Sequence, residues 1–217
     1  MKIGVLGTGD VGRSLAAGLA ARGHEVMIGS RDPTVGRVQD WLRETGMGVQ
    51  AGTFAEAAAH GEVLVLSVNW GHAREVIELA GRANIGGKVL IDTSNPLRFE
   101  AEGELPVLDV SGDDSAGERI QRWLPDARVV KAFNIVNAVH MVDPDFPQGG
   151  PDMFICGNDD EAKYVVADLI SSLGWPPAID LGDIRMSRYL EPLAMVWIVH
   201  FFRNGFDVNH AFKLLRK

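Results

Sequence analysis

Residues 1–31 read MKIGVLGTGDVGRSLAAGLAARGHEVMIGSR, and this stretch decides the fold. The apolar run Lys2–Leu6 predicts a strand, Arg13–Arg22 a helix, and His24–Gly29 a second strand. The turn between the first strand and the helix fits G-x-G-x-x-G, with the residues Gly7, Thr8, Gly9, Asp10, Val11 and Gly12. A strand, a glycine turn, a helix and a strand within about thirty residues form the fingerprint of a dinucleotide-binding unit.

Each glycine of this turn has a separate physical task. Gly7 permits the tight turn after the strand, Gly9 lacks the Cβ atom that would obstruct a pyrophosphate, and Gly12 lets the helix pack close to the strand. The first turn of the helix offers unpaired N–H groups and a partial positive charge to the phosphates. We therefore predict that residues 7–12 bind a dinucleotide, with a glycine turn that holds no ligand as the alternative.

The end of the second strand selects the cofactor. NAD enzymes usually place an acid there, which accepts a hydrogen bond from the ribose 2′-hydroxyl. Here the strand ends in Gly29-Ser30-Arg31, and a hydroxyl beside a guanidinium suits a 2′-phosphate. Asp32 is the alternative, as the ribose acid of an NAD enzyme, but Asp32-Pro33 also fits a helix N-cap followed by proline at the first helical position. The sequence favours NADP(H).

Composition and charge narrow the class of protein. The 217 residues are 46% hydrophobic and 23% charged, as in ordinary globular proteins, and the formal net charge of −8 argues against nucleic acid as the main partner. The single cysteine, Cys156, excludes an internal disulfide and a cysteine-only metal site, and we expect no bound metal. A strand directly after Met1 predicts no signal peptide. The apolar segment Leu193–Phe202 is about half as long as a membrane span, so we expect a cytoplasmic protein that does not enter the membrane.

The rest of the chain alternates strand patterns with helix patterns. This alternation predicts a doubly wound, mainly parallel α/β sheet of the Rossmann type, covered by helices on both faces. Strands are expected at Lys2–Leu6, His24–Gly29, Met47–Ala51, Glu62–Val68, Lys88–Asp92, Arg128–Ala132, Met153–Cys156 and Pro176–Leu181.

Two units follow from this pattern. Residues 1–182 are expected to form an NADP-binding Rossmann domain, and residues 183–217 a C-terminal helical segment docked on it. The long helix of that segment is expected to be interrupted or kinked near Pro192. Within the first unit, Thr53 and Glu56 predict a capping box at the start of a helix.

Ligands of such sheets bind beyond the carboxyl ends of the strands. The residues at or just after those ends are Thr8, Ser30, Arg31, Val68, Asn69, Asn95 and Asn134. We predict that the fold gathers them into a cofactor-binding edge, and the alternative is that each caps a following helix. His72 is a candidate proton donor beside a nicotinamide, with packing or capping as the alternative. Lys131 is interpreted as a structural or surface residue, with a role in the site as its alternative. Trp197 is interpreted as core, with the wall of an acceptor pocket as its alternative.

With these residues noted, the chain resembles the NADPH-dependent reductases of the deazaflavin coenzyme F-420. The resemblance rests on IGVLGTGDVG at Ile3–Gly12, the strand end Gly29-Ser30-Arg31, Trp70 with His72, VKAFN at Val130–Asn134, and SRYLE at Ser187–Glu191. It implies a Rossmann domain with a small C-terminal part, often as a dimer. It also implies that NADP lies over the glycine turn and that the deazaflavin stacks on the nicotinamide, in a cleft below the C-terminal part.

The resemblance extends to individual positions. Thr8, Ser30 and Arg31 correspond to residues on the 2′-phosphate side, and Val68 and Asn69 to the segment that touches the nicotinamide. This chain departs from the family pattern in three places: the stretch Asn134–Pro151 is longer and more polar than the family pattern, and two single positions differ. The basic residue expected soon after Ser-Arg is valine at position 35, with the arginine at position 37 as a possible substitute, and the proline expected before the tryptophan is asparagine at position 69.

We therefore predict an NADP(H)-dependent oxidoreductase that passes a hydride to a deazaflavin or another flat redox acceptor. Such chemistry asks little of the protein beyond placing two rings face to face in a dry site. The alternatives are a flavin, ferric or quinone reductase, and an NADPH-binding sensor or subunit without turnover. The polar residues Asn69, Asn95 and Asn134 favour an enzyme, because a sensor needs no second pocket. The expected partners are the small-molecule acceptor and a second copy in a homodimer.

Overall fold

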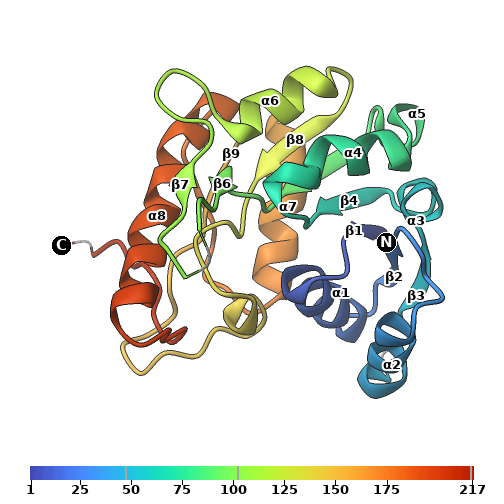
Figure 1. Ribbon diagram of the computed structural model, residues 1–217, viewed down its shortest axis with the longest axis horizontal. Helices are drawn as coiled ribbons and strands as arrows, with labels where there is room; N and C mark the ends of the chain where they lie inside the picture. The colour runs from blue at the N-terminus through green and yellow to red at the C-terminus, as the bar shows by residue number, and fades with distance from the viewer. Residues whose placement is uncertain (47, 102, 216) are drawn as a thin grey trace.

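Strands from the N-terminal half of the chain lie side by side in one parallel sheet (Figure 1). The structure, a computed structural model, describes residues 1–46, 48–101, 103–215 and 217. Its main sheet contains β1 (Lys2–Leu6), β2 (Glu25–Ser30), β3 (Gln50–Thr53), β4 (Val63–Leu66), β5 (Val89–Asp92), β8 (Arg128–Lys131), β9 (Phe154–Gly157) and β10 (Ile179–Asp180). Its strand order is β10-β9-β8-β5-β4-β1-β2-β3. The run from β3 to β8 has the 3-2-1-4-5-6 order of a doubly wound dinucleotide-binding sheet, so the predicted fold class is confirmed.

Two strands at one edge depart from the expected parallel direction. β9 pairs antiparallel with β8, with Lys131 opposite Cys156, and β10 pairs parallel with β9. The segment between β8 and β9 contains the short 3-10 helix η1 (Ala138–His140) and no α-helix that could carry the chain across a face of the sheet. An antiparallel neighbour needs no such crossover, whereas a parallel one does. β9 and β10 therefore run opposite to the other six strands.

Helices cover both faces of the sheet, because the strands alternate apolar side chains between two cores. Val5 of β1 lies in one core and Leu6 in the other. The helices are α1 (Asp10–Ala21), α2 (Gly36–Thr45), α3 (Phe54–His60), α4 (Trp70–Ala80), α5 (Arg82–Ile85), α6 (Ala116–Trp123), α7 (Asp160–Ser172), the 3-10 helix η2 (Ile184–Met186) and α8 (Ser187–Arg203). Helices α1 and α7 close the first core, and α3, α4 and α6 close the second. Figure 1 shows α4 and α6 above the sheet and α1 below it.

Two helix N-caps were predicted from local sequence patterns, and the structure contains one of them. The predicted capping box is present, since the Thr53 hydroxyl accepts from the N–H of Glu56 and the Glu56 carboxylate accepts from the N–H of Thr53. Asp32, in contrast, does not cap α2. Its carboxylate accepts from the N–H and the hydroxyl of Thr34 and closes a local turn, and the helix begins only at Gly36.

Three short strands lie in segments where the sequence predicted other bounds or showed no clear pattern. The expected strand Met47–Ala51 starts at Met47, which lies outside the described residues, and the observed strand is β3. The stretch 98–114, which has no clear pattern in the sequence, contributes to a small antiparallel hairpin. Its strands are β6 (Leu97–Arg98) and β7 (Val107–Leu108).

Buried charges anchor the C-terminal segment to the sheet. Helix α8 continues through Pro192, so the expected interruption does not occur. Glu191 is 1% exposed and its carboxylate lies 2.9 Å from the ammonium group of Lys131. The same carboxylate accepts 3.0 Å hydrogen bonds from the N–H groups of Ala116 and Gly117, at the start of α6. The segment is therefore part of the same packed body as the sheet.

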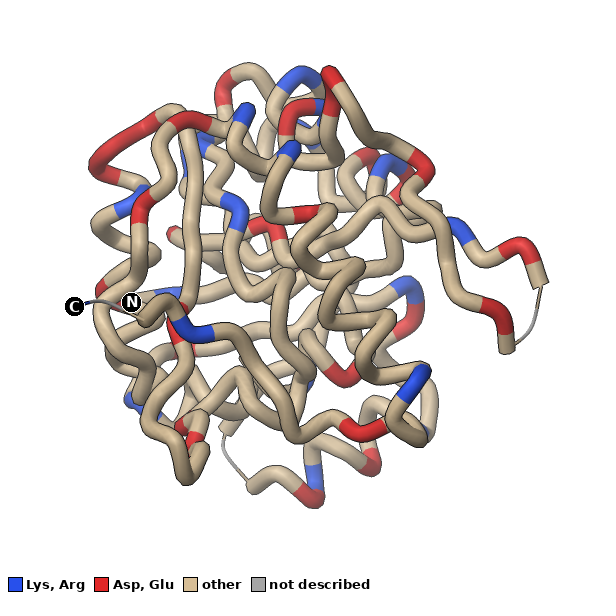
Figure 2. Tube along the Cα trace, turned by 90° about the vertical axis from the view of Figure 1, so that its left-hand side faces the viewer, with Lys and Arg blue, Asp and Glu red and all other residues tan. Residues whose placement is uncertain are grey.

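Charged residues of both signs are interleaved along the described chain (Figure 2). Acidic side chains outnumber basic ones, 29 to 21. Within the residues that the structure describes, no helix is long and apolar enough to cross a membrane.

Candidate active site

The glycine turn between β1 and α1 combines two glycines that packing requires with one that it does not. Gly7 has φ +133°, and a Cβ atom there would lie 2.3 Å from the carbonyl oxygen of Ser67. A Cβ atom on Gly12 would lie 2.1 Å from the carbonyl oxygen of Gly7. At Gly9, which caps α1, a Cβ atom would meet no described atom within 4 Å. The fold itself therefore gives no reason for glycine at position 9, and the open space above it fits a ligand.

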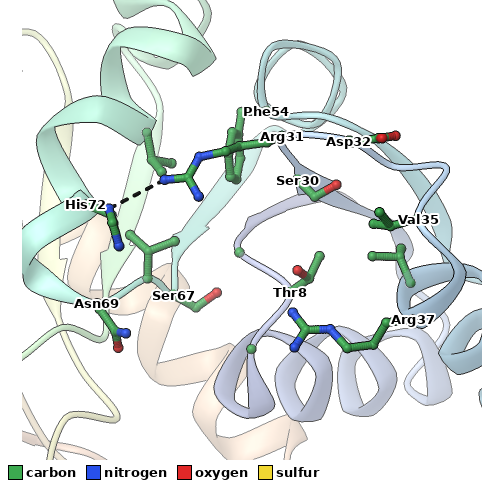
Figure 3. Close-up of a pocket in the computed structure, with 15 residues that line it drawn as sticks. Thr8, Ser30, Arg31, Asp32, Val35, Arg37, Phe54, Ser67, Asn69 and His72 are labelled. Carbon is green, nitrogen blue, oxygen red and sulfur yellow. Dashed lines mark hydrogen bonds between the residues drawn. The ribbon is translucent and has the colours of Figure 1, made fainter.

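A cavity of about 450 Å³ extends from this turn to the end of β2 (Figure 3). Its walls come from the ends of β1, β2 and β4 and from the starts of α2 and α4. Among the residues predicted from the sequence, it brings together Gly7, Thr8, Gly9, Ser30, Arg31, Val68, Asn69 and His72.

One side of this first cavity is polar and positively charged. Ser30 is 7% exposed, and its hydroxyl has no hydrogen-bond partner among the described residues. Arg37 reaches the cavity from α2, and Figure 3 shows its guanidinium beside Thr8. Asp32 also lines the cavity, but its carboxylate is held by the N–H and hydroxyl of Thr34. These hydrogen bonds keep the pKa of Asp32 below its ordinary value. The cavity thus offers donors and a cation to an anion at the position where an NAD enzyme would offer a carboxylate.

Arg31 lies on the opposite side and has an unexpected partner. Its side chain extends from β2 toward α4, where Nε and Nη2 donate to the two carboxylate oxygens of Glu75 at 3.2 and 2.9 Å. Nη2 also lies 3.4 Å from Nδ1 of His72 (Figure 3). Sequence reasoning did not identify Glu75. The only available signal was its position three residues after His72, on the same helical face.

The groove continues past the first cavity. A second cavity of about 430 Å³ shares Gly9, Val68 and Asn69 with the first. A third cavity of about 300 Å³ lies under α8 and shares Asp10, Val11 and Asn95 with the second. Because neighbouring cavities share lining residues, the three lie in a row along the carboxyl ends of the strands, and this row is called the groove below. All of the cofactor-site residues predicted from the sequence except Gly12 line it.

Paired amides separate the second cavity from the third. The side-chain amide of Asn134 donates to Oδ1 of Asn95 at 2.9 Å and to the carbonyl of Leu190 at 3.0 Å, while Asn95 donates to the carbonyl of Asn134 at 2.7 Å. Oδ1 of Asn134 is buried and has no partner in the described part of the chain. Asn69 precedes α4 without a side-chain capping bond. Helix capping therefore does not explain these asparagines, and one acceptor remains unsatisfied at the wall of the third cavity.

The other residues considered from the sequence have structural surroundings. Lys131 is fully buried, with its ammonium group 2.6 Å from Asp92 and 2.8 Å from the carbonyl of Ser94. Burial alone would lower its pKa, but the charges of Asp92 and Glu191 raise the pKa overall, so Lys131 is charged. Trp197 is buried, at 8% exposed, as expected of a core residue, and it also lines the third cavity.

Neither a nucleophilic thiol nor a metal site emerges. Burial raises the pKa of Cys156 to about 11, so its thiol is protonated at neutral pH and inert. Among the residues described, no cluster of three or more His, Cys, Asp or Glu side chains has the arrangement of a metal site.

The strand order, the open position at Gly9 and the groove along the strand ends define a dinucleotide-binding protein of the Rossmann class. A family model described as NADP oxidoreductase, coenzyme F-420-dependent, matches residues 2–96. The F-420-dependent NADP reductase of Methanocaldococcus jannaschii is 33% identical over 210 residues, which cover 91% of each chain. The chain therefore belongs to the family of coenzyme F-420-dependent NADP oxidoreductases, as the resemblance predicted.

Two further comparisons place the chain more finely. The crystal structure of a proposed F-420-dependent NADP reductase from Arthrobacter sp. FB24 superposes with a TM-score of 0.93, at 43% identity and with both chains fully covered. The metalloreductase STEAP3 of Rattus norvegicus is 31% identical over 201 residues, but these span 36% of its length against 89% of this chain. The similarity to the metalloreductase is thus confined to one part of a longer protein.

Proposed function

We propose that this chain transfers a hydride between NADP(H) and coenzyme F-420. One observation carries the proposal: three cavities that share lining residues follow one another from the glycine turn, where the first is cationic, to the space under α8. A dinucleotide has the length to lie along such a strand-end groove, and a second flat ring system needs a pocket beyond its nicotinamide. The relatives from M. jannaschii and Arthrobacter, both described as F-420-dependent NADP reductases, support the same assignment.

The first cavity is proposed to hold the adenosine 2′-phosphate and the pyrophosphate. Backbone N–H groups at the start of α1, in the turn of residues 7–12, face the pyrophosphate, and the open space at Gly9 admits it. The buried, unpartnered hydroxyl of Ser30 fits a 2′-phosphate oxygen. Arg31 and Arg37 supply cations from two sides, so Arg37 takes the place of the basic residue that the family pattern has at position 35.

The second and third cavities are proposed to hold the nicotinamide and the acceptor ring. When bound, NADPH supplies the hydride. Val68 and Asn69 line the second cavity and orient the nicotinamide. In the third cavity, Trp197, which is stacked on His210, contributes apolar lining, and Oδ1 of Asn134 offers a hydrogen-bond acceptor to a ring N–H or an amide. These residues position the rings and exclude water, which is the protein's main contribution to hydride transfer.

His72 receives a different assignment from the one that its position in the sequence suggested. It lines the first cavity beside Arg31 and is not among the residues of the second or third. We therefore assign it to the adenosine end of the groove and give it no role as proton donor.

Three further expectations, on the two units of the chain, the oligomeric state and the location, are also part of the proposal. Residues 1–182 act as the Rossmann domain, and residues 183–217 as a docked segment that completes the acceptor pocket. The chain forms a homodimer, for which the exposed Tyr189 and Val196 on α8 offer apolar surface, 68% and 59% exposed. The cytoplasmic location follows the prediction from sequence. Sedimentation equilibrium tests the dimer.

Binding and turnover measured in parallel test the proposed function. Calorimetric titration is expected to give tighter binding of NADPH than of NADH. Oxidation of NADPH is then followed with F-420, free flavins, quinones and ferric chelates as acceptors. Turnover with F-420 well above that with the other acceptors is expected. Tight NADPH binding without turnover on any acceptor would support a sensor and overturn the proposal.

A further inference from the structure

Arg31, the arginine assigned to the 2′-phosphate, is already engaged in this structure. It makes two hydrogen bonds with the carboxylate of Glu75, and the two groups also form an ion pair with Nη2 and Oε2 2.9 Å apart. Glu75 lies on α4, the helix whose His72 and Val76 line the first cavity. Figure 3 shows Arg31 turned toward His72 on that helix and away from Arg37.

The geometry of this pair sets up a competition. The Nε and Nη2 atoms form the edge of a guanidinium that binds carboxylates and phosphates through two parallel hydrogen bonds, and Glu75 occupies that edge. The hydrogen bonds from Arg31 keep the pKa of Glu75 below its ordinary value, so the carboxylate is ionised at neutral pH. A 2′-phosphate that uses the same edge must displace Glu75, and it also meets the repulsion of a neighbouring negative charge.

We propose that Glu75 competes with the 2′-phosphate of NADP(H) for Arg31 and thereby limits both the affinity for NADPH and the preference over NADH. This inference rests on the proposed NADP(H) site. NADH has a 2′-hydroxyl and makes no demand on the cationic edge of Arg31, so Glu75 affects the two cofactors differently. Glu75 is thus a specificity-determining residue that acts through Arg31.

The size of the effect follows from the exposure of the pair. The side chains of Arg31 and Glu75 are 57% and 50% exposed, so water screens their attraction. Exposed ion pairs of this kind change an equilibrium by roughly 1.4- to 5-fold. Glu75→Gln keeps the shape of the side chain and removes its charge. We expect it to tighten NADPH binding about 2- to 5-fold and to leave NADH binding unchanged.

Helix α4 supplies a matched control. Glu78 lies about one turn further along, is 52% exposed, and pairs with Arg82 outside the groove. Glu78→Gln therefore removes the same charge from the same helix without touching Arg31, and it is expected to leave both dissociation constants unchanged. Dissociation constants of NADPH and NADH are measured by calorimetry for wild type, Glu75→Gln, Glu78→Gln, Arg31→Ala and the double variant Arg31→Ala/Glu75→Gln, at one salt concentration.

The double variant separates competition from a general field effect. If Glu75 acts through Arg31, the gain from Glu75→Gln largely disappears when Arg31 is absent. An equal gain in NADPH affinity in the Arg31→Ala background would overturn the inference. So would NADPH binding by Glu75→Gln that is weaker than, or equal to, that of wild type. An equal gain in NADPH affinity in Glu78→Gln would overturn it as well. These results leave the proposed function standing if wild type still prefers NADPH. A wild type without that preference would overturn both.

Discussion

Replacing Lys131 by methionine removes a fully buried ammonium group at the end of β8. In the wild type, that group lies 2.6 Å from the carboxylate of Asp92 and 2.9 Å from that of Glu191, and both carboxylates are at most 1% exposed. Removing one partner of a buried ion pair costs about 3–5 kcal/mol, because the remaining charge is left uncompensated. Each carboxylate keeps two neutral donors, Glu191 from the N–H groups at the start of α6 and Asp92 from the N–H and hydroxyl of Ser94, but both lose their buried cation. We expect Lys131→Met to lower the free energy of unfolding by about 3–5 kcal/mol.

Urea unfolding followed by tryptophan fluorescence at pH 7 measures this loss. Lys163→Met is the control, since Lys163 also bridges two carboxylates, those of Asp160 and Asp180, at 2.9 and 2.7 Å. Those carboxylates are 84% and 48% exposed, so water replaces the lost partner and a loss of about 0.2–1 kcal/mol is expected. Equal losses in the two variants, or a loss below about 1 kcal/mol for Lys131→Met, would refute the reasoning that burial sets the cost.

Three further predictions concern the groove and the thiol. Gly9→Val should abolish NADPH binding in calorimetry. The free energy of unfolding should change by less than about 0.5 kcal/mol, because the position is open. NADPH affinity within about twofold of wild type would contradict the role of the turn. Arg31→Ala should weaken NADPH binding toward the lower end of roughly 10- to 150-fold, since Glu75 already holds Arg31, and should spare NADH. Equal weakening of both cofactors would instead indicate stacking on the adenine. Iodoacetamide at pH 8 should label Cys156 about 100-fold more slowly in the native protein than in urea, because burial raises the pKa of its thiol to about 11. Equal labelling rates in the two states would contradict the protection by burial.

The sequence predicted the sheet well where short-range patterns determine the structure. The strand, turn and helix around the first glycines, and the capping box at Thr53, depend on neighbouring residues only, and all of them are present. The direction of β9 depends on whether the chain crosses a face of the sheet after Lys131, and no local pattern records that choice. The continuity of α8 through Pro192 likewise depends on tertiary packing, through Glu191 and Leu190, which outweighs the propensity of one residue.

The same division holds for the site. Polar residues at strand ends were identifiable because parallel strands bring their carboxyl ends to one edge, and the structure gathers them there. The partner of Arg31 was not identifiable from the sequence, because packing between distant elements decides which face of α4 meets the end of β2. Oδ1 of Asn134, buried without a partner, is also a tertiary fact. Hydrogen-bond partners and unsatisfied atoms of this kind follow from tertiary packing, and sequence patterns alone do not predict them.

Transfer of the nicotinamide hydrogen itself is the most direct test of the proposed function. The protein is mixed anaerobically with oxidised F-420 and NADPH carrying two deuterium atoms at C4 of the nicotinamide, and the reduced deazaflavin is analysed by mass spectrometry. Because a deazaflavin accepts hydride on carbon, direct transfer predicts one retained deuterium per reduced F-420, and a much slower reaction with equally labelled NADH. Reduced F-420 without deuterium, or no reduction of F-420 by NADPH, would contradict a hydride transfer between the two cofactors in this groove.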